Sequence, residues 1–220
     1  MKNILPKALI ILLFFSTITN AQRNYKEFNV IGISGGITFY DINTSDFDTK
    51  NGESLMLGFQ MRGNLYNNFD MIYGIAFYDT NVAIAGRTVP EVGAQKHINY
   101  NMQSAQIAIL GGYKIIREHL SIEAGPVLNV NGKLTLKDTQ FEDDILDGYT
   151  TLRAKDIEDV SKINFHVAAG MTAGFRNFRI FTQYQYGVTN MLNKLNSQNL
   201  EKTNFKGNSS LLVFGATLYL

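Results

Sequence analysis

The sequence contains no cysteine, and this absence excludes several structures and chemistries together. Disulfide frameworks, thiolate zinc sites, cysteine nucleophiles and a lipidated cysteine at a processed N-terminus all need that residue. Tryptophan is also absent, and only three prolines occur among 220 residues, which leaves little linker material. A protein with this sequence is therefore stabilised by something other than covalent cross-links.

The sequence also has no excess of charge of either sign. The 20 basic and 19 acidic residues leave a formal net charge of +1. Proteins that bind nucleic acid carry a clear basic field, so we expect no nucleic-acid partner. The length and the 45% hydrophobic content suit one domain of ordinary size.

Long apolar runs are the third absence. The longest run covers residues 8–18 and is too short for a membrane-spanning helix, which needs about 20 apolar residues. Lys2 and Lys7 precede this run, and the small residues Thr19 and Ala21 follow it. This arrangement is typical of a secretory signal peptide. We therefore interpret residues 1–21 as a cleaved signal peptide and residues 22–220 as the mature domain.

The remaining sequence alternates apolar and polar residues with a period of two. Residues 54–66 show it most clearly, with Leu55, Leu57, Phe59, Met61 and Leu65 on one face. Successive side chains of a strand point to opposite sides, so one face of such a strand is apolar and the other polar. Seven further segments show the same pattern, at about 28–39, 70–78, 103–115, 120–134, 163–175, 178–187 and 209–220. The pattern predicts an all-β protein.

The connections between these segments alternate strictly in length. Residues 67–69, 116–119 and 176–177 are short turns, whereas the connections at 41–53, 79–102, 135–162 and 188–208 are long. All long loops therefore lie at one end. Short periplasmic turns and long extracellular loops are typical of outer-membrane barrels. We predict an eight-stranded antiparallel up-and-down transmembrane β-barrel located in the outer membrane.

Aromatic residues support this prediction. Phe39, Tyr40, Phe77, Tyr78, Tyr100, Tyr184 and Tyr186 lie near the long loops, and Phe69, Tyr113, Phe175, Phe178 and Tyr219 near the short turns. Two aromatic belts are expected where a barrel meets the two membrane interfaces. A secreted lipocalin-like carrier is the alternative, but we expect no apolar inward face to form its ligand cavity.

Four short motifs carry a family resemblance. They are Ala124-Gly125-Pro126, the stretch AGMTAG at residues 169–174, the stretch YQYGVTNM at residues 184–191, and the last strand ending at Leu220. Together they resemble the Bacteroidota outer-membrane β-barrel family that includes PorT. Residues 105–115 depart from that family, because they lack the proline usually found there. The resemblance implies an outer-membrane barrel with outer-membrane lipid around it and a PorT-like role in type IX protein secretion.

Four charged residues of the polar face lie near the short-turn ends of their strands: Arg62, Lys114, Glu123 and Arg179. The interior of an eight-stranded barrel is filled by side chains, so these charges share one narrow lumen. An isolated buried charge is costly, and we expect Glu123 to pair with at least one of these bases, most simply with Lys114 across the hairpin that joins their strands. The four residues are predicted to form a plug.

Other candidates for chemistry are few. His97, His119 and His166 have no nucleophile motif around them, so we expect no enzyme and no cofactor. Asp143, Asp144 and Asp147 offer oxygens for a weak cation site, although their spacing does not fit the regular calcium loop. The sequence favours a structural or interaction barrel that contacts other envelope or secretion-machinery proteins. A narrow channel for ions or small solutes is the alternative.

Overall fold

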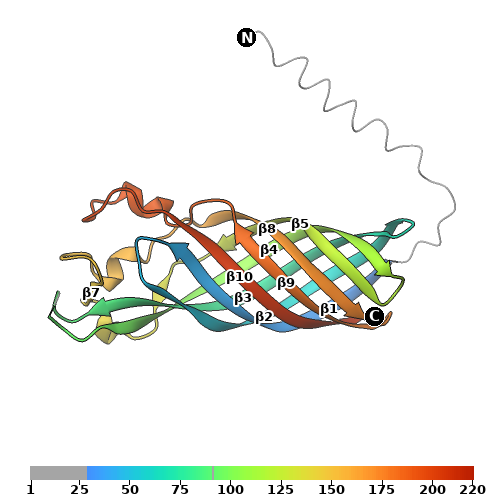
Figure 1. Ribbon diagram of the computed structural model, residues 1–220, viewed down its shortest axis with the longest axis horizontal. Coiled ribbons are helices and arrows are strands. Elements are labelled where there is room, and N and C mark those ends of the chain that lie inside the picture. The colour runs from blue at the N-terminus through green and yellow to red at the C-terminus, as the bar shows by residue number, and fades with distance from the viewer. Residues whose placement is uncertain (1–28, 91) are drawn as a thin grey trace, which may run out of the picture.

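Eight long antiparallel strands close into a ring in the computed structural model (Figure 1), which describes residues 29–90 and 92–220. They are β1 (Asn29–Thr44), β2 (Thr49–Tyr66), β3 (Phe69–Arg87), β4 (Lys96–Ile116), β5 (Leu120–Asn131), β8 (Ile163–Gly174), β9 (Phe178–Gly187) and β10 (Gly207–Tyr219). Each pairs with the next, and β10 closes the ring by pairing with β1. The predicted up-and-down barrel is confirmed. The predicted signal peptide, residues 1–21, lies outside the described residues.

The outer surface of the ring carries the apolar face that the alternation predicted. Leu57 and Phe59 on β2, for example, are each more than half exposed, while their neighbour Gly58 faces inward and is buried. A broad apolar belt on the outside of a barrel cannot be stable in water, and it matches the hydrocarbon layer of a bilayer. Among the described residues, no helix is long and apolar enough to span a membrane.

The strands extend much further at one end than the sequence indicated. Only residues 45–48 join β1 to β2, and only residues 88–95 join β3 to β4. The predicted long connections at 41–53 and 79–102 are therefore wrong. The alternation of side chains continues there, but the inward face is now the apolar one. Tyr40 and Ile42 point inward and are buried, while Asp41 and Asn43 lie on the outer face. Strand residues with a polar outer face resemble loop residues in a sequence, which explains the error.

The inward parity of four tyrosines also corrects the predicted aromatic belts. Tyr40, Tyr78, Tyr100 and Tyr219 are buried inside the ring. Of the aromatic residues predicted for the belts, those exposed on the outside are Phe77, Tyr184 and Tyr186 toward the long loops, and Phe69, Tyr113, Phe175 and Phe178 toward the short turns. The two belts exist with fewer members than expected, because strand parity and not position along the strand decides which aromatics face outward.

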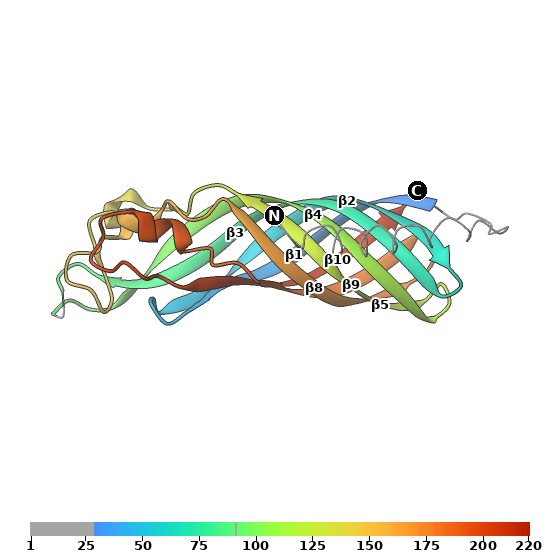
Figure 2. The same cartoon turned by 90° about the horizontal axis from the view of Figure 1, so that it is seen from above.

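Two genuinely long connections fold over the open end of the ring. Residues 132–162 contain β6 (Thr135–Leu136), η2 (Thr139–Phe141), β7 (Ile145–Leu146) and η3 (Ala154–Ile157), and residues 188–206 contain η4 (Asn193–Ser197). β6 extends the sheet beside β4, and β7 extends it beside β3. Figure 2 shows these elements gathered at the end opposite the C-terminus. We call this the long-loop end and the other the short-turn end.

Gly125 in the Ala-Gly-Pro motif has a specific backbone role. Proline has no N–H to donate, and the pairing of β4 with β5 skips Gly125 and Pro126, with the same register on either side. At this point β4 approaches so closely that a Cβ atom on Gly125 would collide with the carbonyl oxygen of Ile109. Glycine is required here because the two backbones are in contact.

Candidate functional site

The lumen at the short-turn end is held by a network of buried ion pairs. Asp70 on β3 accepts from Arg62 on β2, with 3.2 Å from Oδ2 to Nη1, and from Lys114 on β4, with 2.7 Å from Oδ1 to Nζ. Arg62 also pairs with Glu123 on β5. Arg62 and Asp70 are only 5% and 3% exposed. One connected network therefore ties four consecutive strands together inside the ring.

Neutral partners complete this network. The Arg62 Nε donates to the Tyr219 hydroxyl on β10 over 3.1 Å, and the Lys114 Nζ donates to the Asn64 side-chain oxygen over 2.8 Å. Burying charges is expensive, and the cost is offset only when each charge has an opposite partner and further hydrogen bonds. Both requirements are met for Arg62 and Asp70.

Arg179 on β9 lies apart from these ion pairs. Its Nη2 donates to the Glu118 carbonyl oxygen over 2.9 Å, and its Nη1 lies 3.5 Å from the Ser121 hydroxyl. Within residues 29–90 and 92–220 no carboxylate lies within ion-pair distance of it, although it is buried. Arg179 therefore adds a positive charge to this end of the lumen without adding an ion pair.

The structure thus brings Arg62 and Glu123 into contact and places Lys114 and Arg179 at the same end of the lumen. Glu123 pairs with one of the lumen bases, as expected, but that base is Arg62, and Lys114, the partner expected first, binds Asp70 instead. Sequence reasoning missed Asp70 as a member. Its position in the sequence could have indicated this membership. Asp70 has the inward parity of β3, and it lies just after the short turn that joins β3 to the end of β2 that carries Arg62.

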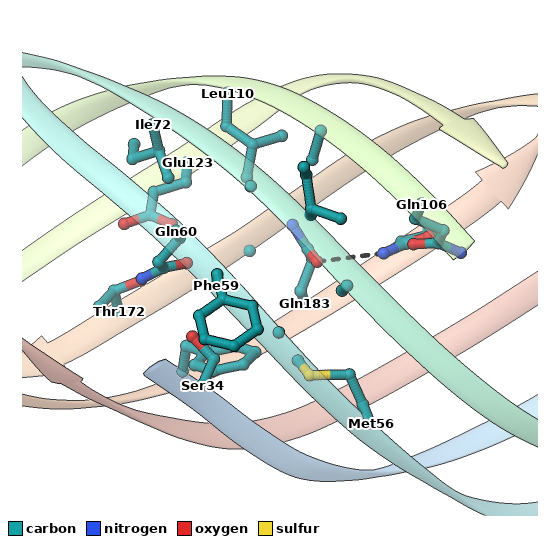
Figure 3. Close-up of a pocket in the computed structure, with 18 of the residues that line it drawn as sticks. Ser34, Met56, Phe59, Gln60, Ile72, Gln106, Leu110, Glu123, Thr172 and Gln183 are labelled. Carbon is teal, nitrogen blue, oxygen red and sulfur yellow. Dashed lines mark hydrogen bonds between the residues drawn. The ribbon is translucent and has the colours of Figure 1, made fainter. Parts of the chain in front are cut away.

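Above the network lies a small cavity in the middle of the ring (Figure 3), with a volume of about 60 Å³. Gln60 and Glu123 lie at one end of it and Gln106 at the other, while Ile72 and Leu110 cover one side. A space of this size holds a few water molecules. The lumen is therefore closed to a solute stream at this level by its own side chains.

His166 on β8 is a buried wall residue of the lumen. Its Nε2 lies 3.0 Å from the Ser209 hydroxyl on β10, and its Nδ1 lies 3.4 Å from the Gln185 side-chain oxygen on β9. The sequence had placed no serine beside it, because the two residues are far apart in the chain. Gln185 stands where a hydrolase would need a carboxylate, and neither Ser209 nor His166 lines the cavity of Figure 3. Among the other histidines, His119 sits in a short turn beside the Gly174 carbonyl, and His97 belongs to β4.

At the long-loop end the inside of the ring is apolar, contrary to expectation. Inward residues of β1, β3 and β4 pack against side chains of the two long loops in one buried cluster. The loop members of the cluster include Leu134, Leu136, Leu146, Leu152, Ile157, Val160, Met191, Leu192, Leu195 and Phe205. Each fully buried large side chain contributes about 1.5–3 kcal/mol to folding, so the cluster is a strong core. We call these two loops, together with the apolar cluster beneath them, the cap.

A hydrogen bond and an aromatic contact fix how the cap sits on the ring. The Tyr100 hydroxyl donates to the Ala154 carbonyl oxygen over 3.0 Å, and Phe47 stacks on Phe205 with ring centroids 5.6 Å apart. The apolar interior at this end is filled by the chain's own loops. It therefore forms a closed core.

Comparison with known protein families decides what kind of barrel this is. The model of the outer membrane protein beta-barrel domain family matches residues 20–193. The chain belongs to this family. It is located in the outer membrane, where its apolar outer surface contacts lipid and its polar lumen is shielded from it. This outer-membrane barrel is therefore not the secreted lipocalin-like carrier considered as an alternative.

Solved structures of several small outer-membrane proteins are similar in fold to this outer-membrane barrel. Ail of Yersinia pestis matches with a TM-score of 0.48 and 14% identity, covering 87% of this chain and 99% of its own. Neisserial surface protein A matches at 0.47 with 10% identity, covering 86% and 96%. OprG of Pseudomonas aeruginosa matches at 0.47 with 8% identity, covering 87% and 96%. A search of curated protein sequences gave no match.

The three acidic residues proposed as a weak cation site are bound by bases of the barrel itself. Asp143 accepts from Lys155 over 2.7 Å and from Arg153 over 2.9 Å, and this lysine contact lowers the pKa of the Asp143 carboxyl. The other two are separated from it: Asp144 pairs with Lys96 and Asp147 with Arg87. In the part of the chain that the structure describes, no group of three or more acidic or histidine side chains is arranged to hold a metal ion.

The carboxylate of Glu201 joins one loop of the cap to the other through several hydrogen bonds. Glu201 accepts from the backbone amides of Thr150, Thr151 and Leu152, at 2.7 to 3.1 Å, and from the hydroxyls of both threonines. The backbone hydrogen bond from Thr151 is the largest of the influences that lower the pKa of Glu201 to about 2. Sequence reasoning missed this residue, because nothing in its own segment marks it as a ligand for backbone amides.

We expect the Glu201 contact to weaken in acid. Because its pKa is lower in the folded protein than in the unfolded chain, the contact is fully present above about pH 4.5 and is lost as the pH falls toward about 2. Glu201→Gln should raise hydrogen exchange at the three amides about tenfold at pH 7, since a charged acceptor is replaced by a neutral one. Glu142→Gln, an exposed acid in the same cap, is the control. Equal exchange in both variants would contradict this role.

Proposed function

We propose that this outer-membrane barrel is a closed, non-enzymatic structural or interaction protein of the cell envelope, and that its folded cap is the surface that contacts other proteins. The observation that supports this most is that the lumen is closed at two levels. Buried ion pairs fill it at the short-turn end, and the apolar cluster fills it at the long-loop end.

The resemblance to the family that includes PorT adds a finer proposal. The motifs around Gly125 and at residues 169–174 and 184–191 lie in strands or directly after one, so they support the scaffold of the barrel. We infer from the resemblance that the partners include components of the type IX secretion machinery. The cap suits such a role, because its loops are held in one conformation by the apolar cluster and by Glu201.

The first test is conductance. The refolded wild-type protein in a planar lipid bilayer should show no sustained single-channel steps, because both closures must open for ions to pass. A refolded porin measured in the same bilayer is the positive control, because its conductance steps show that an inserted open barrel would be detected. Regular ion-selective steps from the wild type would favour the alternative function, a narrow channel for ions or small solutes.

The second test is site-specific cross-linking in intact cells. A photoreactive amino acid at Lys137, exposed on the cap, should give adducts with an envelope protein, and those adducts should include secretion components if the PorT-like proposal holds. The same amino acid at Leu57, on the lipid-facing surface, is the matched control and should give no such adduct. Adducts at Leu57 alone, or at neither position, would contradict a cap-mediated interaction.

A further inference from the structure

A pocket of about 470 Å³ opens below the charge network at the short-turn end. Its basic lining residues come from four parts of the chain: Arg62, Lys114, Arg117, Arg176 and Arg179. Arg62 and Arg179 are buried at its base, while Arg117 and Arg176 are exposed on two turns at its rim. Outer-membrane barrels have their short turns in the periplasm, so the pocket faces that compartment.

The charges of this pocket do not balance. Asp70 and Glu118 are its acidic lining residues, and Glu123 reaches Arg62 from the next layer. Even without Arg176, four bases therefore face three acids, which leaves about one positive charge in a partly enclosed space where charges interact more strongly than in water. A pocket with this surplus attracts anions.

Guanidinium donors remain available for such an anion. The hydrogen bonds of Arg179 go to the Glu118 carbonyl and, at 3.5 Å, to the Ser121 hydroxyl, which leave its charge uncompensated. Arg117 makes no hydrogen bond or ion pair to the described residues. Planar guanidinium groups bind phosphate oxygens through two parallel hydrogen bonds, and several of them around one space suit a multiply charged phosphate.

We propose that this pocket binds an anionic phosphate ligand. The rim lies at the level of the inner-leaflet headgroups, so the phosphate can belong to an anionic lipid or to a soluble periplasmic compound. The recognition chemistry is the same in both cases. The site does not depend on whether the cap binds a protein partner, because the two lie at opposite ends of the barrel.

Calorimetric titration with inorganic pyrophosphate tests the pocket directly. In a phosphate-free maltoside detergent the wild type should bind pyrophosphate, and Arg117→Gln should weaken binding about tenfold, since a charge-assisted contact is lost. Arg117 is on an exposed turn, so the variant should fold, which thermal unfolding checks. Lys137→Gln removes one charge from the exposed surface of the cap and is the matched control.

Lipid nanodiscs distinguish the two sources. If the ligand is a lipid headgroup, pyrophosphate binding should weaken in discs that contain cardiolipin compared with discs of phosphatidylcholine alone. If the ligand is soluble, the affinity should be the same in both. The proposal is overturned if pyrophosphate does not bind in detergent or in either disc, or if the control variant loses as much affinity as the rim variant.

Discussion

Asp70→Asn is expected to lower the free energy of unfolding in lipid by about 3 kcal/mol, the lower end of what breaking a fully buried ion pair costs. Asp70 is the only acid among the described residues that binds two bases of the lumen, the buried Arg62 and the partly buried Lys114. Removing its charge leaves Lys114 with the neutral Asn64 side chain and an unpaired positive charge. The cost stays at the lower end because the pocket beneath admits water.

Two variants make this result specific, with urea unfolding in liposomes as the measurement. Glu123→Gln should cost less than Asp70→Asn, because Arg62 keeps Asp70 as its partner. Asp79→Asn, on the outer face of the same strand, should change stability by no more than about 0.5 kcal/mol. An equal effect of Asp70→Asn and Asp79→Asn would show that the charge network does not stabilise the barrel.

Phe59→Arg is expected to be comparably destabilising for a different reason. Phe59 is 52% exposed near the middle of the apolar belt of β2, where its side chain contacts lipid. An arginine at the bilayer midplane of such a barrel costs about 2–4 kcal/mol, because its charge loses water. Folding in liposomes should therefore be weakened by that amount, whereas in detergent the loss should be smaller.

Glu53→Arg is the matched control for the lipid-facing position. Glu53 lies on the same strand and the same outer face, six residues nearer the long-loop end, where the outer face is polar. The depth dependence of charged residues predicts a cost of about 0–1 kcal/mol there. Equal losses at Phe59 and Glu53 would mean that the apolar belt is not where the bilayer lies.

The sequence alone was sufficient to predict the barrel and the direction of its faces. Strand side chains alternate with a period of two whatever the strand pairs with, so the outward positions of Leu57 and Phe59 follow from the local pattern. The short turns are equally local, because two or three residues between strands leave only an antiparallel return. Arg62, Lys114, Glu123 and Arg179 were placed at the short-turn end by counting from these turns.

The tertiary structure decided which residues meet inside the ring. Ring closure and strand register bring Glu123 to Arg62, and they bring Ser209 across β9 to His166. The cap depends equally on long-range packing: Tyr40 and Ile42 gain a core only because loops more than 90 residues away fold over them. A period-two pattern states which side of a strand a residue occupies, but the neighbour on that side is set by the registers of all eight strands together.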